Sequence, residues 1–581
     1  MQEREQAFSL KSLFVPLTTL KAIHIIVIVG FIVFGNALFN AFVGDDVTQI
    51  VNNPLVHSFS NLLTYFSGST FYNGGTNYFA GVYYKPFLST YFSIIYTFFG
   101  PNYIAFHFFQ ILLHIINVCI IFLFFKHFFR KSVSLILALI FLVHPINSES
   151  VFYISAVQEV LFFFFGMLAL WILINFRSKK STILASMCLF FSLLSKETGI
   201  LFIGISILYL LFFNKNRTYV MLGFLVPTIA AYTFLRIHAV GILTKSMAAP
   251  IDQLNLLERS FNMPLIFFFY IKTFLFPLNL ASSYQWAYTY ISYNHFFLPL
   301  VLDFFFFIAV IFLAVFLFKN FSRKYLRIYI FSSSWFLFGI LLHLQIIPLD
   351  VTAAERWFYF PIVGLLGMIG VLLDTFHVNM RKKWSILIIL MILVLLSTRT
   401  FIRSFDWKND FTLASRDIKV SPDAYDLEAI ISNELIKQGK FKEAKIHAEQ
   451  SVRLYPYLTT YNILGLSYLG LGDYKKAKEA YLNALKFGDY YITYENLAGL
   501  TMITGDPNKN IHFIRSSLKK FPQDAKLWLY LAVLEYRTGN INAAKNAIVQ
   551  AYFYNQNSEV SFVYKKIMNN LPLDLNFSVG K

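Results

Sequence analysis

The sequence has few charged residues and almost no cysteine. Only 14% of its 581 residues are charged and two are cysteines, whereas about 25% of the residues in a typical soluble protein are charged. Low charge with high hydrophobicity excludes an intrinsically disordered chain, and two cysteines exclude a disulfide-stapled secreted scaffold. Cys119 and Cys188 lie in apolar runs, so we expect small buried side chains there. No Cys/His spacing typical of a metal site occurs.

What the sequence has in abundance is apolar surface. Hydrophobic residues make up 57% of the chain, which contains 68 phenylalanines, and soluble cores could not bury that much. The net charge of +18 belongs mostly to residues 1–402, with 26 basic and 13 acidic residues, rather than to 403–581, with 23 and 18. A nucleic-acid partner would require a basic face on a soluble domain. We therefore expect a membrane domain over 1–402, a soluble domain over 403–581 and no nucleic-acid partner.

Eleven apolar runs are long enough, or nearly so, to cross a bilayer. They lie at about 22–43, 103–125, 133–144, 152–175, 181–194, 199–213, 218–236, 298–318, 328–346, 357–373 and 384–402. The first run lacks a small-residue cleavage site and is expected to be a retained anchor. Two further runs, 86–99 and 263–280, are ambiguous, and the second contains Pro277.

The loop charges decide between these possibilities through the positive-inside rule. With eleven crossings, 18 of the 26 basic residues of the membrane part fall on one side. They are Arg4, Lys11, Lys21, Lys126, Arg130, Lys131, Arg177, Lys179, Lys180, Lys215, Arg217, Lys319, Arg323, Lys324, Arg327, Arg381, Lys382 and Lys383. We therefore expect a cytoplasmic N-terminus, residue 403 outside the cytoplasm, and interfacial or re-entrant helices at 86–99 and 263–280, the latter bent near Pro277. The membrane is a bacterial cytoplasmic membrane or that of the endoplasmic reticulum.

Ten of the thirteen acidic residues of the membrane part lie at or near the outer ends of these runs. They are Asp45, Asp46, Glu149, Glu159, Glu197, Asp252, Glu258, Asp303, Asp350 and Glu355. The acids either occupy short outer loops or line a cavity that opens on the outer face. The sequence leaves both interpretations open.

The last third of the chain carries a repeat. Residues 461–488 read YNILGLSYLGLGDYKKAKEAYLNALKFG and follow the tetratricopeptide pattern of aromatic, Leu, Gly and Ala positions. Equivalent positions at Ala444, Ala477, Asn510 and Ala544 recur every 33 or 34 residues. We expect an α-solenoid with a half-repeat near 407–422 and a capping helix near 559–569. Such arrays bind peptides or proteins in a groove, although this one could also be a structural lid or an assembly platform.

Several polar groups at the outer ends could carry chemistry. Asp45 and Asp46 follow the first run, and adjacent carboxylates repel, so one is readily tuned as a base; a polar pair at a helix end is the alternative. Ionisable groups near membrane depth are costly and often functional. Those in specific-looking sequences are His144, Glu149, Glu159, Lys196, Glu197, Glu355 and Arg356. His107 and His114, on one helix face, either form hydrogen bonds in the core or face the cavity.

The order of these motifs resembles the transmembrane and tetratricopeptide-repeat O-mannosyltransferase family. The motifs are Asp-Asp at 45–46, Tyr-Lys-Pro at 84–86, His107 with His114, HPINSE at 144–149 with Gln-Glu at 158–159, Ser-Lys-Glu at 195–197, AERWFYFP at 354–361, Trp407 with Asp410, and the repeats. That family belongs to the GT-C superfamily of polyprenyl-phosphate-sugar-dependent glycosyltransferases. The resemblance implies an all-α, polytopic fold of about eleven spans, a lipid-phosphate-linked sugar donor and transfer to protein Ser or Thr.

The resemblance also implies roles for individual residues. The catalytic base would be Asp45 or Asp46, with Asp45 favoured, and Lys85 stands where relatives have Arg before the proline. Gln158 departs from the family pattern. The acceptor and sugar would be positioned by Glu149, Glu159, His144, His107 and His114. The donor phosphate would be bound by Lys85, Lys196, Arg236 and Arg356, supported by Glu197 and Glu355. No metal ligand is assigned, although some relatives in the superfamily use a divalent metal.

These roles suit the chemistry. A polyprenyl phosphate leaves with negative charge that basic side chains can stabilise, and a carboxylate can remove the proton of the acceptor hydroxyl. We expect a direct displacement that inverts the sugar carbon. Two alternatives remain: the same donor with a lipid or glycan acceptor, and a non-catalytic membrane-anchored repeat scaffold. The sequence leaves the sugar, the acceptor and the linkage undetermined.

Overall fold

The computed structural model describes residues 17–71, 83–241, 249–378 and 382–573. These residues are almost entirely helical, and one isolated antiparallel bridge joins Tyr284 to Ala353. Three of the basic residues used for the topology, Arg4, Lys11 and Arg381, lie outside the described residues. The expected all-α fold is confirmed.

Each of the eleven apolar runs forms a helix. These helices are α2 (Thr19–Phe34), α5 (Tyr103–Phe128), α6 (Lys131–Val143), α8 (Val157–Asn175), α9 (Lys179–Ser195), α10 (Ile200–Phe213), α11 (Thr218–Val240), α14 (Leu298–Asn320), α15 (Arg323–Leu341), α16 (Pro361–Thr375) and α17 (Lys383–Asp406). Polar side chains fix several starts: Asn102 accepts a hydrogen bond from the N–H of Ile104 ahead of α5, and Ser178 accepts one from Ser181 at α9.

Six of the described helical segments are long and apolar enough to cross a membrane. They are Thr19–Phe39, Tyr103–Phe128, Ile154–Asn175, Lys215–Val240, Tyr293–Asn320 and Lys383–Asp406. A seventh crossing arises if α6 and the segment Pro145–Phe152, which meet at 51°, form one bent span. The protein is therefore a multi-pass membrane protein with six or seven candidate spans. The expected count of eleven is larger because it also includes α9, α10, α15 and α16, which are shorter or less apolar.

Shorter helices connect the bundle at the end where the acids lie. They are α3 (Thr64–Ser67), α4 (Pro86–Phe99), α7 (Ser148–Phe152), α12 (Leu256–Ser260) and α13 (Met263–Leu275). The two ambiguous apolar runs are thus α4 and α13. The second run does not bend near Pro277 as expected: α13 ends at Leu275, and Pro277 lies in the loop that follows. Proline lacks the N–H that a continuing helix would need.

Small residues let the bundle helices approach closely. At Gly364 on α16, an added Cβ would lie 2.4 Å from the backbone nitrogen of Phe336 on α15. The backbones of the two helices are therefore in direct contact at this crossing, as is common in membrane bundles. Around it, aromatic rings interdigitate, with Trp335 and Phe360 centroids 5.3 Å apart.

The C-terminal helices form the expected repeat array. They are α18 (Asp410–Asp417), α19 (Tyr425–Lys437), α20 (Phe441–Leu454), α21 (Leu458–Gly470), α22 (Tyr474–Leu485), α23 (Tyr491–Thr504), α24 (Pro507–Lys520), α25 (Ala525–Arg537), α26 (Ile541–Tyr554) and α27 (Ser558–Met568). Ala444, Ala477 and Ala544 are fully buried, and Gly465 lies against the ring of Tyr481. The repeat pattern is confirmed.

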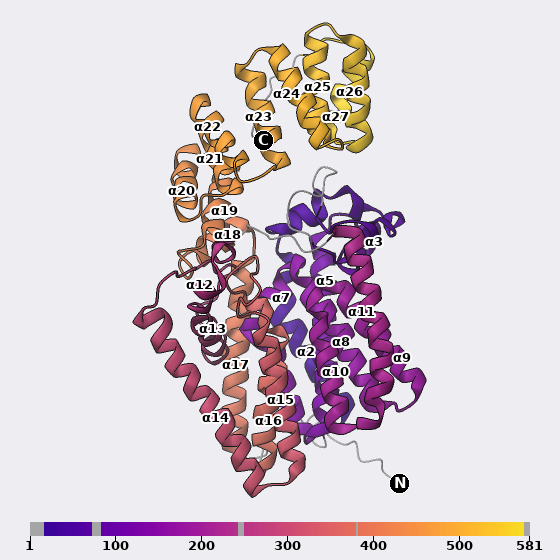
Figure 1. Cartoon of the computed structure of the whole chain (residues 1–581), viewed down its shortest axis with the longest axis vertical. Coiled ribbons are helices and arrows are strands. Elements are labelled where there is room, and N and C mark those ends of the chain that lie inside the picture. The colour runs from indigo at the N-terminus through magenta and orange to yellow at the C-terminus, as the bar shows by residue number, and fades with distance from the viewer. Residues whose placement is uncertain (1–16, 72–82, 242–248, 379–381, 574–581) are drawn as a thin grey trace, which may run out of the picture.

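The array sits at one end of the bundle (Figure 1). The boundary expected at residue 403 falls within α17, which continues to Asp406. Arg403 is buried there, and its guanidinium donates to both carboxylate oxygens of Asp417 in α18, at 2.6 and 2.9 Å. A buried ion pair thus joins the last bundle helix to the first helix of the array.

Candidate functional site

A cavity of about 300 Å³ lies where the bundle meets the repeat array. Asp45, Lys85 and Arg356, which come from three separate segments of the chain, all line it. The rest of its lining is Gln49, Phe71, Tyr83, Leu88, Tyr153, Ser155, Gln158, Gln285, Asp350, Val351, Tyr425, Asp426, Tyr457 and Thr459. Two of the ten acids at this end of the bundle, Asp45 and Asp350, therefore border this cavity.

The two adjacent aspartates have opposite surroundings. Asp45 is exposed on the cavity wall, and its backbone N–H donates to the hydroxyl of Tyr153 at 3.0 Å. Asp46 is fully buried; it accepts from the N–H and hydroxyl of Ser155, both at 2.7 Å, and from the N–H of Val43 at 3.0 Å. Asp46 therefore fixes the loop, whereas Asp45 presents a carboxylate to the cavity.

The surroundings also shift the pKa values of both aspartates. The protein walls of the cavity disfavour charge and raise the pKa of Asp45, opposed by the positive charge of Arg356 and reinforced by the negative charge of Asp350. Burial raises the pKa of Asp46 to about 7, against the hydrogen bonds from Ser155 and Val43. A raised pKa makes the Asp45 carboxylate a stronger base than an ordinary aspartate.

The segment after α17 holds the loop that carries Asp45. The N–H of Gly44 donates to the carboxylate of Asp410 at 2.7 Å, and the N–H of Ala41 donates to the carbonyl of Lys408 at 3.1 Å. Gly44 has φ +53°, a left-handed conformation that glycine adopts easily. Trp407 packs on the ring of Tyr153, with centroids 5.6 Å apart. Trp407 and Asp410, the paired motif of the sequence, thus set the position of Asp45.

Two cationic side chains line the cavity, Lys85 and Arg356, and they differ in whether they form an ion pair. Lys85 is buried, its ammonium lies 4.3 Å from the centre of the Tyr83 ring, and burial lowers its pKa. Within the described part of the chain it forms no ion pair, so its charge is available to an anion. Arg356 is bound to Glu149, which accepts from its guanidinium and, at 2.8 Å, from its N–H. Glu149 therefore orients Arg356 from behind the wall.

The repeat array supplies part of the cavity wall. Tyr425 and Asp426 of α19 and Tyr457 and Thr459 near the start of α21 line it. Asp426 accepts hydrogen bonds from Ser283 at 2.5 Å and from Gln285 at 3.3 Å. The array is therefore bonded to the loop at 281–285, which borders the same cavity.

Glu355 lies behind that loop rather than on the cavity. It is buried and accepts hydrogen bonds from the N–H of Ala281 and the hydroxyl of Tyr284, both at 2.8 Å. Burial raises its pKa to about 8. Glu355 thus supports the wall by binding the segment that carries Gln285.

The other charged residues singled out in the sequence form pairs beside the cavity. Lys196 bonds to Glu159, and Arg236 bonds to Glu197 at 2.7 Å. The charges of Glu197, Lys196 and Glu159 all act on Lys85, so these pairs lie close to it. They do not themselves line the cavity formed by the described residues.

The three histidines belong to the core among the described residues. The ring of His114 bonds to the hydroxyl of Tyr359 at 2.8 Å and to the carbonyl of Leu142 at 3.2 Å. The Nε2 of His144 bonds to the carbonyl of Phe274, and its Nδ1 accepts from the N–H of Ile146. Both ring nitrogens of His144 are therefore occupied. His107 is buried, and none of the three lines the cavity. The hydrogen bonds of His114 favour the core interpretation for that residue, and the roles of His107 and His114 stay predictions.

Several cavity residues were not singled out as site residues in the sequence. Tyr83 donates its hydroxyl to Asp350 at 2.9 Å, which places a hydrogen-bonded pair beside Lys85. Tyr153, Tyr425, Asp426 and Tyr457 are the others. The two repeat tyrosines follow no motif, and only the folded contact between array and bundle brings them here. Among the described residues, no cluster of three or more His, Cys, Asp or Glu side chains could hold a metal ion.

Comparison with known proteins gives two family matches. Residues 85–242 match the family described as dolichyl-phosphate-mannose-protein mannosyltransferase, and residues 458–487 match a tetratricopeptide repeat. A protein O-mannosyl-transferase of Caenorhabditis elegans is 24% identical over 446 residues, covering 74% of this chain and 62% of that protein. The human protein O-mannosyl-transferase TMTC3 is 23% identical, covering 80% of this chain and 55% of that protein.

The chain thus spans less than two thirds of the length of these curated relatives. Among solved structures, ArnT from Cupriavidus metallidurans bound to undecaprenyl phosphate aligns with a TM-score of 0.37 at 14% identity, covering 80% of this chain and 79% of that one. The family matches and relatives confirm the resemblance drawn from the motifs. Residues 85–242 match the model of the dolichyl-phosphate-mannose-protein mannosyltransferases, and three quarters or more of this repeat-bearing chain is distantly similar to the protein O-mannosyl-transferases.

Proposed function

We propose that this protein transfers mannose from a polyprenyl-phosphate donor, of the dolichyl type, to a Ser or Thr hydroxyl of an acceptor protein. The observation that carries the proposal is the meeting of Asp45, Lys85 and Arg356 at one cavity between the bundle and the array. A carboxylate next to two cations suits the removal of a hydroxyl proton and the departure of a lipid phosphate. The family match over residues 85–242 supports this donor class.

The residues divide the reaction between them. The Asp45 carboxylate takes the proton of the acceptor hydroxyl as its oxygen attacks the sugar carbon. The bond from that carbon to the phosphate oxygen breaks, and its electron pair leaves with the lipid phosphate. Lys85 and Arg356 stabilise the phosphate charge, with Glu149 orienting Arg356. The pairs Lys196–Glu159 and Arg236–Glu197 flank the phosphate site, and Asp46 holds the base loop.

Such a displacement inverts the sugar carbon. The roles assigned above use no metal, although a divalent ion could accompany the donor phosphate.

We also propose the topology that this chemistry requires. Eleven helices cross the membrane, α4 and α13 lie at its surface, and the N-terminus is cytoplasmic. The catalytic cavity and the array then share the extracytoplasmic side. Residues 1–402 form the catalytic domain and 403–581 the repeat domain. Support comes from the basic residues: Lys126, Lys131 and Lys319 lie at the ends of helices away from the cavity.

The test is transfer of labelled mannose from a synthetic polyprenyl-phosphate donor to a Ser/Thr peptide by the purified full chain. We expect Asp45→Asn to lower transfer by about 10²–10⁴-fold, the range for loss of a general base. Asp423→Asn, an exposed aspartate on the array, is the matched control and should leave transfer unchanged. Full activity in Asp45→Asn would remove the base from the mechanism. A wild-type chain that transfers no mannose would refute the function.

The same assay separates the alternative acceptors. Label incorporated into native membranes that is released by protease identifies a protein acceptor. Label that survives protease and extracts into organic solvent identifies a lipid acceptor instead. A chain that binds donor but transfers label to neither fits the repeat-scaffold alternative.

A further inference from the structure

A second cavity, larger than the catalytic one, also lies between the bundle and the array. Its volume is about 640 Å³. The bundle contributes the first loop, through Val51, Asn52, Pro54 and His57. The array contributes the N-terminal ends of α23, α25 and α27 and the turn after α26, and its charged lining residues are Glu495, Asp524, Lys526 and Glu559.

The two cavities are neighbours along the chain and along the array. The short helix Val47–Val51 stands between them: Gln49 lines the catalytic cavity, and Val51 lines the second one. On the array side, the lining passes from Tyr457 at α21 to Tyr491 at α23 and on to α25 and α27. An extended segment lying along the array could therefore reach both cavities.

The second cavity carries an excess of negative charge. Three carboxylates line it, from Glu495, Asp524 and Glu559, against one ammonium from Lys526. The Lys526 ammonium lies 3.4 Å from Glu495 and compensates that charge. Glu559 is exposed at the start of α27 and forms no ion pair with another described residue. Two acidic side chains, Asp524 and Glu559, thus line the cavity without an ion-pair partner among the described residues.

Asp524 distinguishes this cavity from a group of acidic residues on the surface, because its side chain is buried. The residue is 3% exposed, and its Oδ1 accepts from the N–H groups of Lys526 and Leu527, which caps α25. Its Oδ2 is buried and has no donor among the described residues. A buried carboxylate oxygen without a donor is costly, and a ligand that donates would remove that cost. Burial raises the pKa of Asp524, and the adjacent negative charge of Glu495 raises it further; a cation bound beside the two carboxylates would oppose this shift.

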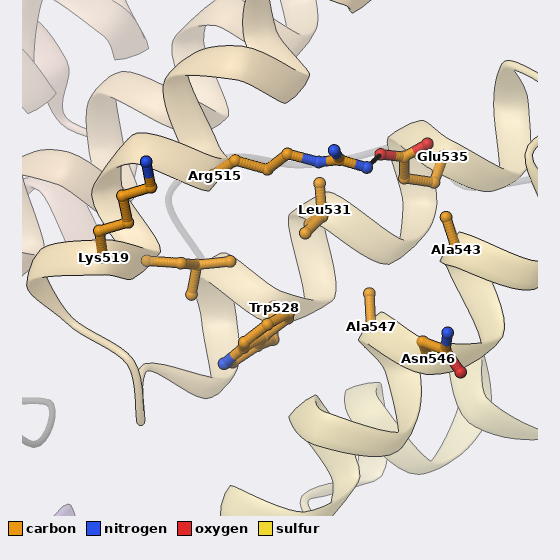
Figure 2. Close-up of a pocket in the computed structure, with 9 residues that line it drawn as sticks. Arg515, Lys519, Trp528, Leu531, Glu535, Ala543, Asn546 and Ala547 are labelled. Carbon is orange, nitrogen blue, oxygen red and sulfur yellow. Dashed lines mark hydrogen bonds and ion pairs between the residues drawn. The ribbon is translucent and has the colours of Figure 1, made fainter.

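A groove elsewhere on the array lacks this feature. It lies between α24, α25 and α26 (Figure 2), where the Arg515 side chain reaches across to Glu535 at 2.7 Å. Below that pair the lining is apolar, with Trp528, Leu531 and Ala547. Its one carboxylate is paired with Arg515 and Lys519 adds a positive charge, so this groove does not favour binding of a cation.

We propose that the second cavity binds a Lys or Arg side chain of the acceptor polypeptide while the neighbouring Asp45 cavity holds the Ser or Thr that is modified. An ammonium or guanidinium donates to Asp524 Oδ2 and compensates Glu495 and Glu559. The acceptor is then an extended chain with a basic residue at a fixed separation from the modified hydroxyl. This inference rests on the proposed transferase function and specifies its substrate.

The test uses a peptide series with one Thr and a single Lys at each successive position on either side, alongside the same peptide with Ala or Glu in place of Lys. We expect Lys at one narrow range of separations to lower KM at least about tenfold relative to Ala, with kcat unchanged. Glu495→Gln and Asp524→Asn should abolish that advantage and leave kinetics with the Ala peptide unaltered. Asn is as good a helix cap as Asp, so the second substitution keeps α25 intact.

Two further variants make the result decisive. Glu559→Lys, on an exposed position, should shift the preference from the Lys peptide toward the Glu peptide. Glu479→Gln, an exposed glutamate on α22, is the matched control and should keep the wild-type preference. If transfer occurs but Lys has no effect at any separation, or Glu495→Gln and Asp524→Asn keep the preference, the inference is overturned while the transferase function stands. If no peptide is mannosylated, the transferase function itself is overturned.

Discussion

Asp45 and Asp46 show how neighbouring residues of one type can serve different ends. Three hydrogen bonds occupy the Asp46 carboxylate, from Val43 and twice from Ser155, so it stabilises the loop. The side chain of Asp45 accepts no such set and faces the cavity with Asp350 and Arg356. A substitution at Asp46 should therefore affect folding and a substitution at Asp45 should affect chemistry.

The pH dependence of transfer tests the role of Asp45 directly. A base must be ionised, so kcat/KM should rise with pH through the pKa of Asp45, which is raised above the ordinary value. It should fall again at alkaline pH as Lys85, whose pKa is lowered, loses its proton. The negative charge of Asp350 contributes to the raised pKa of Asp45, so Asp350→Asn should move the acidic limb to lower pH. Asparagine still accepts from Tyr83.

The measurement is a pH profile of kcat/KM for wild type, Asp350→Asn and Asp423→Asn. Asp423 lies outside the catalytic cavity and serves as the charge-matched control, so its limb should coincide with that of wild type. An acidic limb that stays in place in Asp350→Asn would contradict the assignment of Asp45 as the titrating base.

Between α15 and α16, backbone contact replaces side-chain packing. At Gly364 an added Cβ would meet the nitrogen of Phe336 at 2.4 Å and the carbonyl oxygen of Ser332 at 2.5 Å. Both are backbone atoms, which cannot turn aside as a side chain can. The crossing positions α16, which begins at Pro361, shortly after the turn Glu355–Tyr359 that carries Arg356.

We therefore expect Gly364→Ala to destabilise the protein by about 1–3 kcal/mol, the usual cost of overpacking. The two helices would have to separate, so the midpoint of thermal unfolding in detergent should fall. Gly223→Ala on α11, where an added Cβ meets nothing within 4 Å, is the matched control and should match wild type. Equal unfolding midpoints for the two variants would show that the helices adjust without cost.

At the scale of the whole molecule, the sequence predicts individual helices and repeats better than it predicts which of them contact one another. Apolar length and loop charge place the bundle helices, and Ala and Gly at a fixed period place the repeats, because each signal is local. Asp45, Lys85 and Arg356 could be named from ordered motifs. Tyr425 and Tyr457 could not, since nothing near them in sequence indicates that the array folds back against the bundle.

The three histidines show what tertiary packing adds to a sequence motif. His107, His114 and His144 look reactive in an apolar sequence, yet the described structure places them in the core, with His114 bonded to Tyr359 and His144 bonded to backbone. Most buried polar side chains have a hydrogen-bond partner, and backbone carbonyls of adjacent segments supply one for His114 and for His144. Only tertiary packing tells such a histidine from one that faces a ligand.

The buried pair of Arg403 and Asp417 determines how the two halves of the molecule are held together. Both side chains are almost completely buried, and Asp417 also accepts from the N–H of Ser282 at 2.7 Å. Removing one partner of a buried pair leaves an uncompensated charge and costs about 3–5 kcal/mol. We expect Arg403→Met to lower the thermal midpoint and to loosen the array that carries Tyr425 and Tyr457.

Loosening the array should raise KM for the acceptor peptide while the affinity for the lipid-linked donor, held by Lys85 and Arg356, stays near that of wild type. Arg416→Met, an exposed arginine one residue before Asp417, is the matched control. The measurement pairs thermal unfolding with separate acceptor and donor titrations. An Arg403→Met variant that weakens donor and acceptor equally would mean that the array acts on the whole fold; an unchanged acceptor KM would mean that the catalytic cavity does not need the array as a wall.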